Sequence, residues 1–274
     1  MREIEQQTIL ITGATDGLGR EVARQVAQRG ATVLVHGRRE ERVEAAIADI
    51  ALTTGSDRLV PYVADLSSLA AVRALGEDVA ARRGGLHALV NNAGVALKER
   101  VESADGYEYT FAVNYLATYL LTRMLVPALV RSAPARIVNV ASIGQAPVNF
   151  DDVMLEDGYQ MDFAYAQSKL AMIAFTFELA GRMRADGESG VTVTALHPAT
   201  LMPTKLVFDA VGHTVDTLEQ GVAATLRLVI EPELDGVSGV YFDGLEEAAA
   251  DPQAYDADAR RRLWDLSEQL CRMR

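Results

Sequence analysis

One stretch near the amino end of the chain restricts the possible fold more than any other. Residues 8–30 read "TILITGATDGLGREVARQVAQRG": an apolar run, three closely spaced glycines, and an amphipathic segment that ends at Gly30. This order predicts a buried strand, a tight turn and a helix. Gly13 permits the sharp exit from the strand, Gly17 lets a phosphate group approach the backbone, and Gly19 allows the helix to pack closely. Because the start of a helix offers free N–H groups to an anion, the stretch predicts a nucleotide-binding turn.

The rest of the chain continues the alternation of short apolar runs and longer amphipathic stretches. This alternation predicts right-handed βαβ crossovers and a parallel sheet whose strands are buried on both faces. A closed eight-stranded barrel shares the pattern, but the glycine turn is typical of an open sheet that binds ligands beyond the carboxyl ends of its strands. We therefore expect one α/β domain over residues 1–274, a doubly wound Rossmann fold with a parallel sheet of about seven strands. The expected strands are 8–12, 31–36, 58–63, 87–91, 136–141, 191–196 and 239–242, and the expected helices are 17–29, 39–52, 67–83, about 107–130, about 163–185 and 217–230.

Composition limits the partners and the compartment. The formal charge of −12 argues against a nucleic-acid partner, because phosphate binding requires clustered Lys and Arg. The one cysteine, Cys271, cannot form an intrachain disulfide, which fits a reducing cytoplasm. The first residues contain no leader-like apolar run, and no membrane span is expected. The four histidines lack the spacing of metal ligands, so we expect a cytoplasmic protein without a metal site.

The ends of the second and third expected strands bear on the choice of cofactor. Proteins that bind NAD usually place Asp or Glu after the second strand to accept a hydrogen bond from the ribose 2′-hydroxyl. This chain has Gly37, which offers no carboxylate, and then Arg38, which can pair with a 2′-phosphate. We expect a preference for NADP(H), with NAD(H) as the alternative, although "RREERVEAA" also reads as a solvated helix start. Asp65, after the third strand, is suited both to capping a helix and to bonding the adenine.

A tyrosine and a lysine one helical turn apart indicate chemistry. Tyr165 and Lys169 share a helix face, and Lys169 is one of three lysines among 26 basic residues. A free phenol is a poor base at neutral pH because its pKa is near 10, and a nearby ammonium would lower that pKa. Ser142 ends the fifth expected strand, where the active site of an open sheet should lie. Asn114 lies within an expected helix despite the poor helix propensity of asparagine.

These motifs together resemble a known family. "TGATDGLG", "NNAG", "VASIG" and "YAQSK" occur in the order and spacing of the short-chain dehydrogenase/reductase family, over essentially the whole chain. "YAQSKLAMIAFTFELAGRM" and the long interval from Ser142 to Tyr165 resemble the retinol-dehydrogenase-like branch of bacterial oxidoreductases. The resemblance implies an NAD(P)-linked enzyme that acts on alcohol and carbonyl groups.

The resemblance also implies a role for each matching residue. Tyr165 would be the general acid in reduction and the base in oxidation, and Ser142 would hydrogen-bond the substrate oxygen. Lys169 would hold the nicotinamide ribose, Asn114 would position a water in a proton relay, and Thr12 would brace "NNAG". The implied cofactor contacts are Gly13, Thr15, Asp16, Gly17, Leu18, Gly19, Arg38, Asp65, Leu66, Asn92, Ala93, Gly94, Tyr165, Lys169, Pro198 and Thr200.

The match departs from the family after the sixth expected strand. The family commonly has Pro-Gly followed by a Thr that reaches the nicotinamide amide, whereas this chain has Ala199 in place of the glycine. Thr204 lies one residue beyond the usual spacing, so Thr200 and Thr204 are both candidates for that contact. Residues 200–215 read either as a mobile substrate lid or as an ordinary surface loop. Residues from about 246 to 274 read as a C-terminal extension with an amphipathic helix that packs on its own domain, with a subunit interface or a substrate cover as the alternatives.

Two classes of function follow. The leading one is an NADP-dependent oxidoreductase that transfers a hydride between nicotinamide and a carbonyl or alcohol. The alternative is a non-catalytic NAD(P)-binding sensor or scaffold, which would have little use for Ser142 or Asn114. Met, Phe, Val and Leu around the expected catalytic centre favour an apolar substrate, although such residues also pack cores. Family analogy implies a homodimer or homotetramer, with the helices near 107–130 and 163–185 as contacts.

Overall fold

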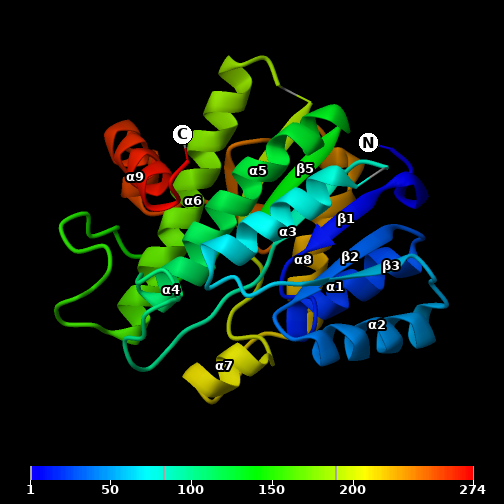
Figure 1. Cartoon of the computed structure of the whole chain (residues 1–274), viewed down its shortest axis with the longest axis horizontal. Helices are drawn as coiled ribbons and strands as arrows, with labels where there is room; N and C mark the ends of the chain where they lie inside the picture. The colour runs from blue at the N-terminus through cyan, green and yellow to red at the C-terminus, as the bar shows by residue number, and fades with distance from the viewer. Residues whose placement is uncertain (1, 83, 189, 274) are drawn as a thin grey trace.

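An eight-stranded sheet runs through the molecule in the order β3-β2-β1-β4-β5-β6-β7-β8 (Figure 1). The computed structural model describes residues 2–82, 84–188 and 190–273. Strands β3 to β7 are parallel, and β8 pairs antiparallel with β7. The order reverses between β1 and β4, so their carboxyl ends flank the crevice in which doubly wound sheets bind ligands. The strands are β1 (Thr8–Ile11), β2 (Thr32–Gly37), β3 (Leu59–Val63), β4 (Ala88–Asn91), β5 (Ala135–Val140), β6 (Val191–His197), β7 (Val240–Asp243) and β8 (Glu246–Glu247).

Helices cover both faces of the sheet, each over its own apolar core. One core joins the sheet to α3, α5, α6 and α9. The other joins it to α1, α2 and α8, and Figure 1 shows these two groups in separate layers. The α-helices are α1 (Gly17–Gln28), α2 (Glu40–Thr54), α3 (Leu69–Ala81), α4 (Tyr109–Phe111), α5 (Ala117–Arg131), α6 (Met161–Ala185), α7 (Lys205–Ala210), α8 (Leu218–Ile230) and α9 (Ala257–Leu270). The other helical turns are η1 (Ile4–Gln6), η2 (Ala112–Leu116), η3 (Pro232–Leu234) and η4 (Pro252–Tyr255).

The predicted strands and helices lie where the sequence places them, and two details of the sheet differ. Strand β3 is not buried on both faces, because it is the edge strand and most of its residues are partly or fully exposed. Pro61 in its centre fits this position, since an edge strand can lack one N–H donor. Strand β8 is an additional strand of two residues, too short to leave a periodic signal.

The predicted helix near 107–130 is interrupted. It consists of α4, the π-helical turn η2 and α5, and η2 contains Asn114 at its centre. Among the described residues, the stretch Tyr109–Arg131 is long and apolar enough to cross a membrane, with a mean hydropathy of 1.3. However, 72% of the 18-residue window with this mean hydropathy is buried inside the fold. Its apolar composition therefore fits a core helix packed between the sheet and neighbouring helices.

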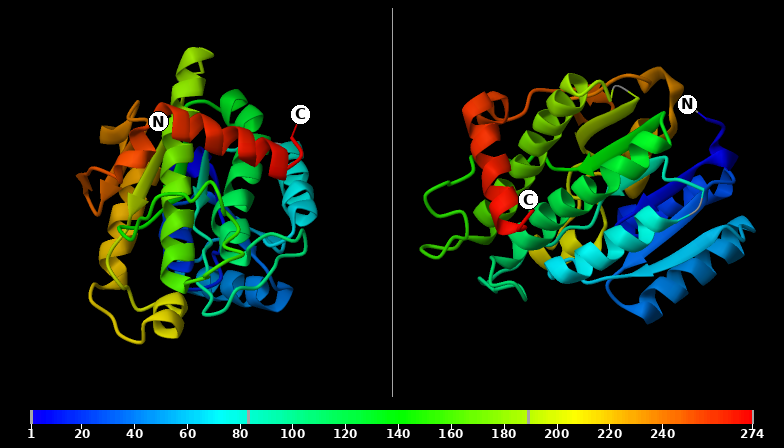
Figure 2. Two further views of the ribbon diagram at one scale, coloured as in Figure 1. Left: turned by 90° about the vertical axis from the view of Figure 1, so that its left-hand side faces the viewer. Right: turned by 45° about the horizontal axis from the view of Figure 1, so that its top comes forward.

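The C-terminal segment folds back onto the helical layer that contains α5 and α6. Helix α9 crosses these helices (Figure 2), as the amphipathic pattern predicts. The Trp264 ring packs edge-on against Tyr119 of α5, with the centroids 5.4 Å apart, and in a tilted arrangement against Phe175 of α6 at 6.0 Å. The hydroxyls of Tyr115 and Ser267 add a buried hydrogen bond of 2.7 Å. The extension is therefore part of the core.

Candidate active site

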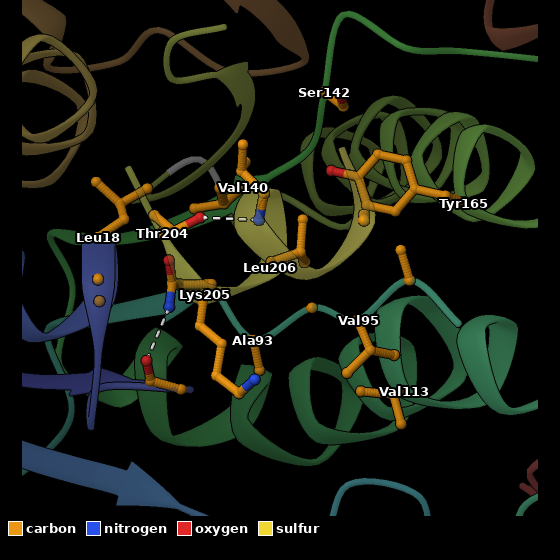
Figure 3. Close-up of a pocket in the computed structure, with 18 of the residues that line it drawn as sticks. Leu18, Ala93, Val95, Val113, Val140, Ser142, Tyr165, Thr204, Lys205 and Leu206 are labelled. Carbon is orange, nitrogen blue, oxygen red and sulfur yellow. Dashed lines mark hydrogen bonds between the residues drawn. The ribbon is translucent and has the colours of Figure 1, made fainter. Parts of the chain in front are cut away.

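A cavity of about 850 Å³ opens at the carboxyl ends of the central strands. Its walls come from the glycine turn, the ends of β2 to β6, the start of α6, and the segment after β6. Figure 3 shows Leu18 and Thr204 together at one end, and Ser142 and Tyr165 at the other, with the phenol oxygen directed into the cavity. The cavity thus joins the predicted nucleotide turn to the predicted catalytic residues.

The glycine turn has the conformation that its sequence predicts. Gly13 and Gly17 adopt left-handed backbone angles, with φ of +65° and +49°, which glycine reaches without strain. A Cβ at Gly19 would lie 2.4 Å from both Asn92 Nδ2 and the carbonyl oxygen of Gly13. Asp16 caps α1 by accepting from the N–H of Gly17 at 2.8 Å. The glycines therefore allow the tight, closely packed turn that brings the backbone N–H groups of the helix start to the cavity, as an anion site requires.

Two buried side chains hold this turn, and only Thr12 is predicted from the sequence. Thr12 Oγ1 accepts from the backbone N–H groups of Asn92 at 2.9 Å and Ala93 at 3.1 Å. His36 Nδ1 accepts from the N–H of Gly13 at 3.3 Å, so its Nε2 carries the proton and donates to the carbonyl of Ala64 at 3.2 Å. Burial lowers the pKa of His36 to about 4. The histidine is neutral at neutral pH and links β2 to the turn.

The end of β2 brings several arginines to the cavity. A Cβ at Gly37 would lie 2.4 Å from the Thr15 side chain, so no carboxylate can replace this glycine without movement of the turn. Arg38 lines the cavity and donates to the Tyr109 hydroxyl at 2.9 Å. Arg39 and Arg42 line it as well, and the sequence does not single them out. The arrangement places positive charge and no acidic side chain directly after β2.

Asp65 lies on the cavity wall but is not the cap of the following helix. Its Oδ1 accepts from the N–H and the hydroxyl of Ser67, at 2.9 and 2.8 Å. Helix α3 is capped by Ser68, which accepts from the N–H of Ala71. The capping role proposed for Asp65 is therefore wrong, and its position on the wall leaves the adenine contact as a prediction.

The predicted catalytic residues meet where β5 ends and α6 begins. Lys169 is buried and its Nζ donates to the carbonyl of Val140 at 2.8 Å. The same Nζ lies 5.4 Å from the centroid of the Tyr165 ring. The Ser142 hydroxyl oxygen accepts from the N–H of Gly144 at 3.1 Å, so the hydroxyl hydrogen is directed to partners in the cavity such as Tyr165. Tyr241, which the sequence does not single out, holds the Ser142 carbonyl at 3.0 Å.

The pKa of Tyr165 beside Lys169 differs in its direction from the prediction. Burial raises the pKa of Tyr165, and the hydrogen bond with Ser142 lowers it to a smaller extent. Burial also lowers the pKa of Lys169 to about 8. In the protein alone the ammonium therefore does not lower the pKa of the phenol below its ordinary value, because desolvation has the larger effect. Sequence spacing indicates which groups are neighbours but not how strongly they are desolvated.

Asn114 lies behind the cavity wall. Its Oδ1 accepts from the N–H of Val95 at 2.8 Å, and its Nδ2 donates to the carbonyl of Val95 and to Ser168 Oγ at 3.0 Å each. These bonds fix the segment after β4 to α6, which carries Tyr165 and Lys169. The structure therefore shows a bracing position for the side chain, and its role in a proton relay stays a prediction.

The segment after β6 crosses the cavity between two backbone anchors. At its neck the N–H of Val215 donates to the carbonyl of Leu201 at 3.1 Å, and the N–H of Asp216 donates to that of Thr200 at 2.9 Å. Thr204 caps α7 and lies so close to Gly17 that a Cβ there would be 3.1 Å from its methyl group. Both Thr200 and Thr204 line the cavity, so the segment forms part of its wall, and a lid role stays a prediction.

The structure places the remaining predicted residues on the same cavity, with Asn114 as the exception. On its wall lie Gly13, Thr15, Asp16, Gly17, Leu18, Gly19, Arg38, Asp65, Leu66, Asn92, Ala93, Gly94, Ser142, Tyr165, Lys169, Pro198 and Thr200. Apolar side chains that the sequence does not assign individually line the catalytic end. They are Val95, Leu97, Val113, Ile143, Met161, Leu206 and Val211. Their signal in the sequence is position alone: they follow a strand end, belong to the segment after β6, or lie in η2 (Val113) or at the start of α6 (Met161).

This fold and this cavity define an open α/β oxidoreductase that binds a nicotinamide dinucleotide. The family profile described as "short chain dehydrogenase" matches residues 7–210. The chain belongs to this family, and within it to the retinol-dehydrogenase-like branch, whose members act on alcohol and carbonyl groups with NAD(P).

Individual relatives agree with this assignment. Human retinol dehydrogenase 11 is 35% identical over 280 residues, which cover 97% of this chain and 86% of the relative. Mouse retinol dehydrogenase 13 is 35% identical over 285 residues, with 97% and 84% covered. A crystal structure of an uncharacterised protein from Mycobacterium paratuberculosis superimposes with a TM-score of 0.80 at 31% identity, over 97% of this chain and 94% of that one. A second, from Beutenbergia cavernae, is assigned as an NAD(P)-dependent gluconate 5-dehydrogenase and contains NADP. It gives a TM-score of 0.69 at 28% identity, over 86% and 94%.

Proposed function

We propose that the protein is an NADP(H)-preferring reductase or dehydrogenase of apolar aldehydes, ketones or alcohols, with Tyr165 as its general acid and base. The observation that carries this proposal is the continuity of one cavity from the glycine turn to Ser142, Tyr165 and Lys169. A nucleotide-binding sensor would need the first part of that cavity but not the second. Its volume of about 850 Å³ lies within the range of sites that bury a cofactor or a drug-sized ligand.

The residues present fit a nicotinamide dinucleotide. Side chains at Gly13 and Gly19 would collide with Ala93, Asn92 and the Gly13 carbonyl, so the two glycines allow the close-packed turn at the start of α1 on which a pyrophosphate would bind. Arg38 and the other arginines after β2 would hold a 2′-phosphate. Lys169, buried near Gly94, would hold the nicotinamide ribose. When bound, the cofactor supplies or accepts the hydride.

The chain's own groups handle the proton and the oxygen. In the reduction direction Ser142 donates a hydrogen bond to the carbonyl oxygen, because that oxygen can only accept, while the N–H of Gly144 holds the Ser142 oxygen in place. Tyr165 then gives its proton to that oxygen, and the Lys169 ammonium and Ser142 stabilise the phenolate that forms. In oxidation the same groups act in reverse. The apolar walls exclude water and favour an apolar substrate.

The test of this activity follows NADPH absorbance with a panel of apolar aldehydes, ketones and quinones, and then the reverse reaction with alcohols and NADP. We expect consumption by the wild type and a rate at least about a hundredfold lower in Tyr165→Phe, which should still bind NADPH. Binding of cofactor without turnover in either direction would instead favour the sensor.

The cofactor preference has a separate test. We expect Arg38→Ala to weaken NADPH binding about tenfold and to leave NADH binding nearly unchanged, because only NADPH carries the 2′-phosphate. Arg29→Ala, on the exposed end of α1, is the matched control. An unchanged preference in Arg38→Ala excludes this role for the arginine.

A cytoplasmic location is part of the same proposal. It is supported by Cys271, which is free and buried, with its thiol pKa raised to about 12 by burial. Fractionation of cells that express the full chain would test it, and recovery with the membrane pellet would contradict it.

A further inference from the structure

His197 is a buried residue on the cavity wall to which neither the sequence nor the proposed mechanism assigns a role. It is the last residue of β6, and its side chain and backbone are 6% exposed. Its backbone is held in the sheet, opposite Asp243 of β7, and its carbonyl accepts from the N–H of Gly244 at 2.8 Å. The residue is therefore a rigid part of the scaffold.

The ring of His197 reaches from this scaffold to the lid. Its Nε2 shares a hydrogen bond of 3.1 Å with the hydroxyl of Thr200, three residues further along the chain. The backbone of Thr200 is bonded on both sides to Asp216, with its N–H on the carboxylate at 2.6 Å and its carbonyl on the N–H at 2.9 Å. Thr200 therefore connects the sheet, through the side chain of His197, to both chain segments at the neck of the lid.

The charges around His197 come from three elements. Lys169 of α6 lowers its pKa, in the same direction as the larger effect of burial, whereas Asp243 of β7 and Asp216 of the neck raise it. The net direction is downward, so the ring is neutral at neutral pH. A neutral ring can accept the hydrogen of the Thr200 hydroxyl or donate to its oxygen. In either case it fixes the direction in which that hydroxyl presents itself to the cavity.

We propose that His197 is a positioning residue that orients Thr200 and, through it, holds the neck of the lid at the nicotinamide end of the cavity. The inference rests on the proposed function, which defines that end of the cavity. It also accounts for the choice between Thr200 and Thr204: only Thr200 is tied to the sheet by a side chain, whereas the hydroxyl of Thr204 caps α7. Thr200 is therefore the threonine with a fixed place relative to the catalytic residues.

The test measures NADPH affinity by fluorescence titration, in the full chain and without substrate, for His197→Leu and His197→Gln. We expect His197→Leu to bind NADPH about tenfold more weakly, because the neck loses its bond to the sheet. His197→Gln keeps a side-chain hydrogen-bonding group and should recover binding to within about twofold of the wild type. His213→Leu, on the exposed part of the lid, is the matched control and should bind like the wild type.

The pH dependence of NADPH affinity is a second readout. It would be the same in the wild type and the variants if His197 were only structural. Because burial lowers the pKa of His197, its ring gains a proton only at a pH below the ordinary histidine range, and the new charge attracts the Asp216 carboxylate away from the N–H of Thr200. Wild-type affinity should therefore fall in acid, and part of this fall should be missing in His197→Gln. Affinity and pH dependence equal to those of the wild type in His197→Leu would overturn the proposal. So would equal losses in the Leu and Gln variants.

The same bond can be tested from its other partner if His197→Leu does not fold. Thr200→Ser keeps the hydroxyl and Thr200→Val removes it, so only the valine variant should lose affinity. Equal binding by both would again overturn the proposal. Because NADPH binding is measured without turnover, a wild type that binds but does not react would refute the proposed function while still testing His197.

Discussion

Lys169 lies with its ammonium against the Val140 carbonyl, and a Cβ at Gly94 would be only 3.4 Å from Nζ. We expect Lys169→Arg to lower kcat at least about a hundredfold although the charge is kept, because a planar guanidinium neither fits this space nor supplies a compact charge. Steady-state kinetics of the two proteins would measure it. Arg at this position with wild-type kcat would contradict the argument.

His36 makes the stability of the protein and the glycine turn sensitive to pH. Its folded-state pKa is lowered to about 4 from 6.5, so its contribution to stability is fully present above pH 6.5 and is lost as the pH falls towards 4. The loss from this residue is about 3 kcal/mol. The protonated ring can no longer accept from the N–H of Gly13, so cofactor affinity should decline as the pH approaches 4, where the folded protein binds this proton.

Urea unfolding at several pH values would measure this contribution. The free energy of unfolding should fall with acid less steeply in His36→Gln than in the wild type, and His213→Gln should follow the wild type because His213 is exposed. The pKa values of the buried His87 and His197 are lowered too. The free energy of unfolding should therefore still depend on pH in every variant. Parallel curves for wild type and His36→Gln would exclude the assigned role.

Residue spacing predicts neighbours well and energetics poorly. Tyr165 and Lys169 are found on one helix face beside Ser142, as their positions in the sequence indicate. The direction of the Tyr165 pKa could not be predicted, because desolvation depends on how completely the surrounding chain excludes water. His36 carries no sequence motif, since its role arises from a turn that lies beside it only after folding.

At the scale of elements, the glycine turn and α1 depend on the absence of a side chain at Gly19. We expect Gly19→Ala to weaken NADPH binding more than about tenfold and to cost roughly 1–3 kcal/mol of stability, because the new Cβ would be 2.4 Å from Asn92 Nδ2 and the Gly13 carbonyl. Thermal unfolding and NADPH titration would measure both effects.

A second helical glycine is the matched control. Gly181 lies in α6, and a Cβ there would meet nothing within 4 Å. Gly181→Ala should therefore raise stability by about 0.5–1 kcal/mol and leave cofactor binding unchanged. If the two substitutions behaved alike, the crowding around Gly19 would not explain the requirement for glycine.

Periodicity locates the strands and helices of this chain but not their environment. The apolar run of β3 resembles those of the central strands, yet β3 is an edge strand, which depends on the order of all the strands. The π-helical turn at Asn114 leaves no mark in the apolar pattern, because all five of its residues are buried and no polar face shows the change of period. Two residues are too few for β8 to be recognised.

At the scale of the whole molecule, α9 covers the helices that family analogy names as subunit contacts. The Trp264 ring lies between the guanidinium groups of Arg123 of α5 and Arg182 of α6, at 4.4 and 4.0 Å. These faces of α5 and α6 are therefore buried within one chain. A homo-oligomer stays a prediction, but one formed through these faces would require α9 to move.

We expect Trp264→Ala to cost about 3–5 kcal/mol of stability, because it removes a buried aromatic side chain and two cation–π contacts. Urea unfolding would measure the loss, and light scattering would report whether the uncovered helices associate. Leu52→Ala is the control, since Leu52 is 86% exposed and should change stability by less than about 0.5 kcal/mol. A small effect at Trp264 would show that α9 is only loosely attached.

The closeness of Thr204 to Gly17 leads us to predict the order of events in a catalytic cycle. A lid that reaches from Thr200 to the glycine turn would cover both ends of the site, so a dinucleotide that binds first would be enclosed together with the substrate. The substrate would then bind last and its product would be released first. The dinucleotide would be exchanged only after the lid has opened. We therefore expect an ordered kinetic scheme in which the exchange of oxidised for reduced dinucleotide, rather than the hydride step, limits the turnover of good substrates.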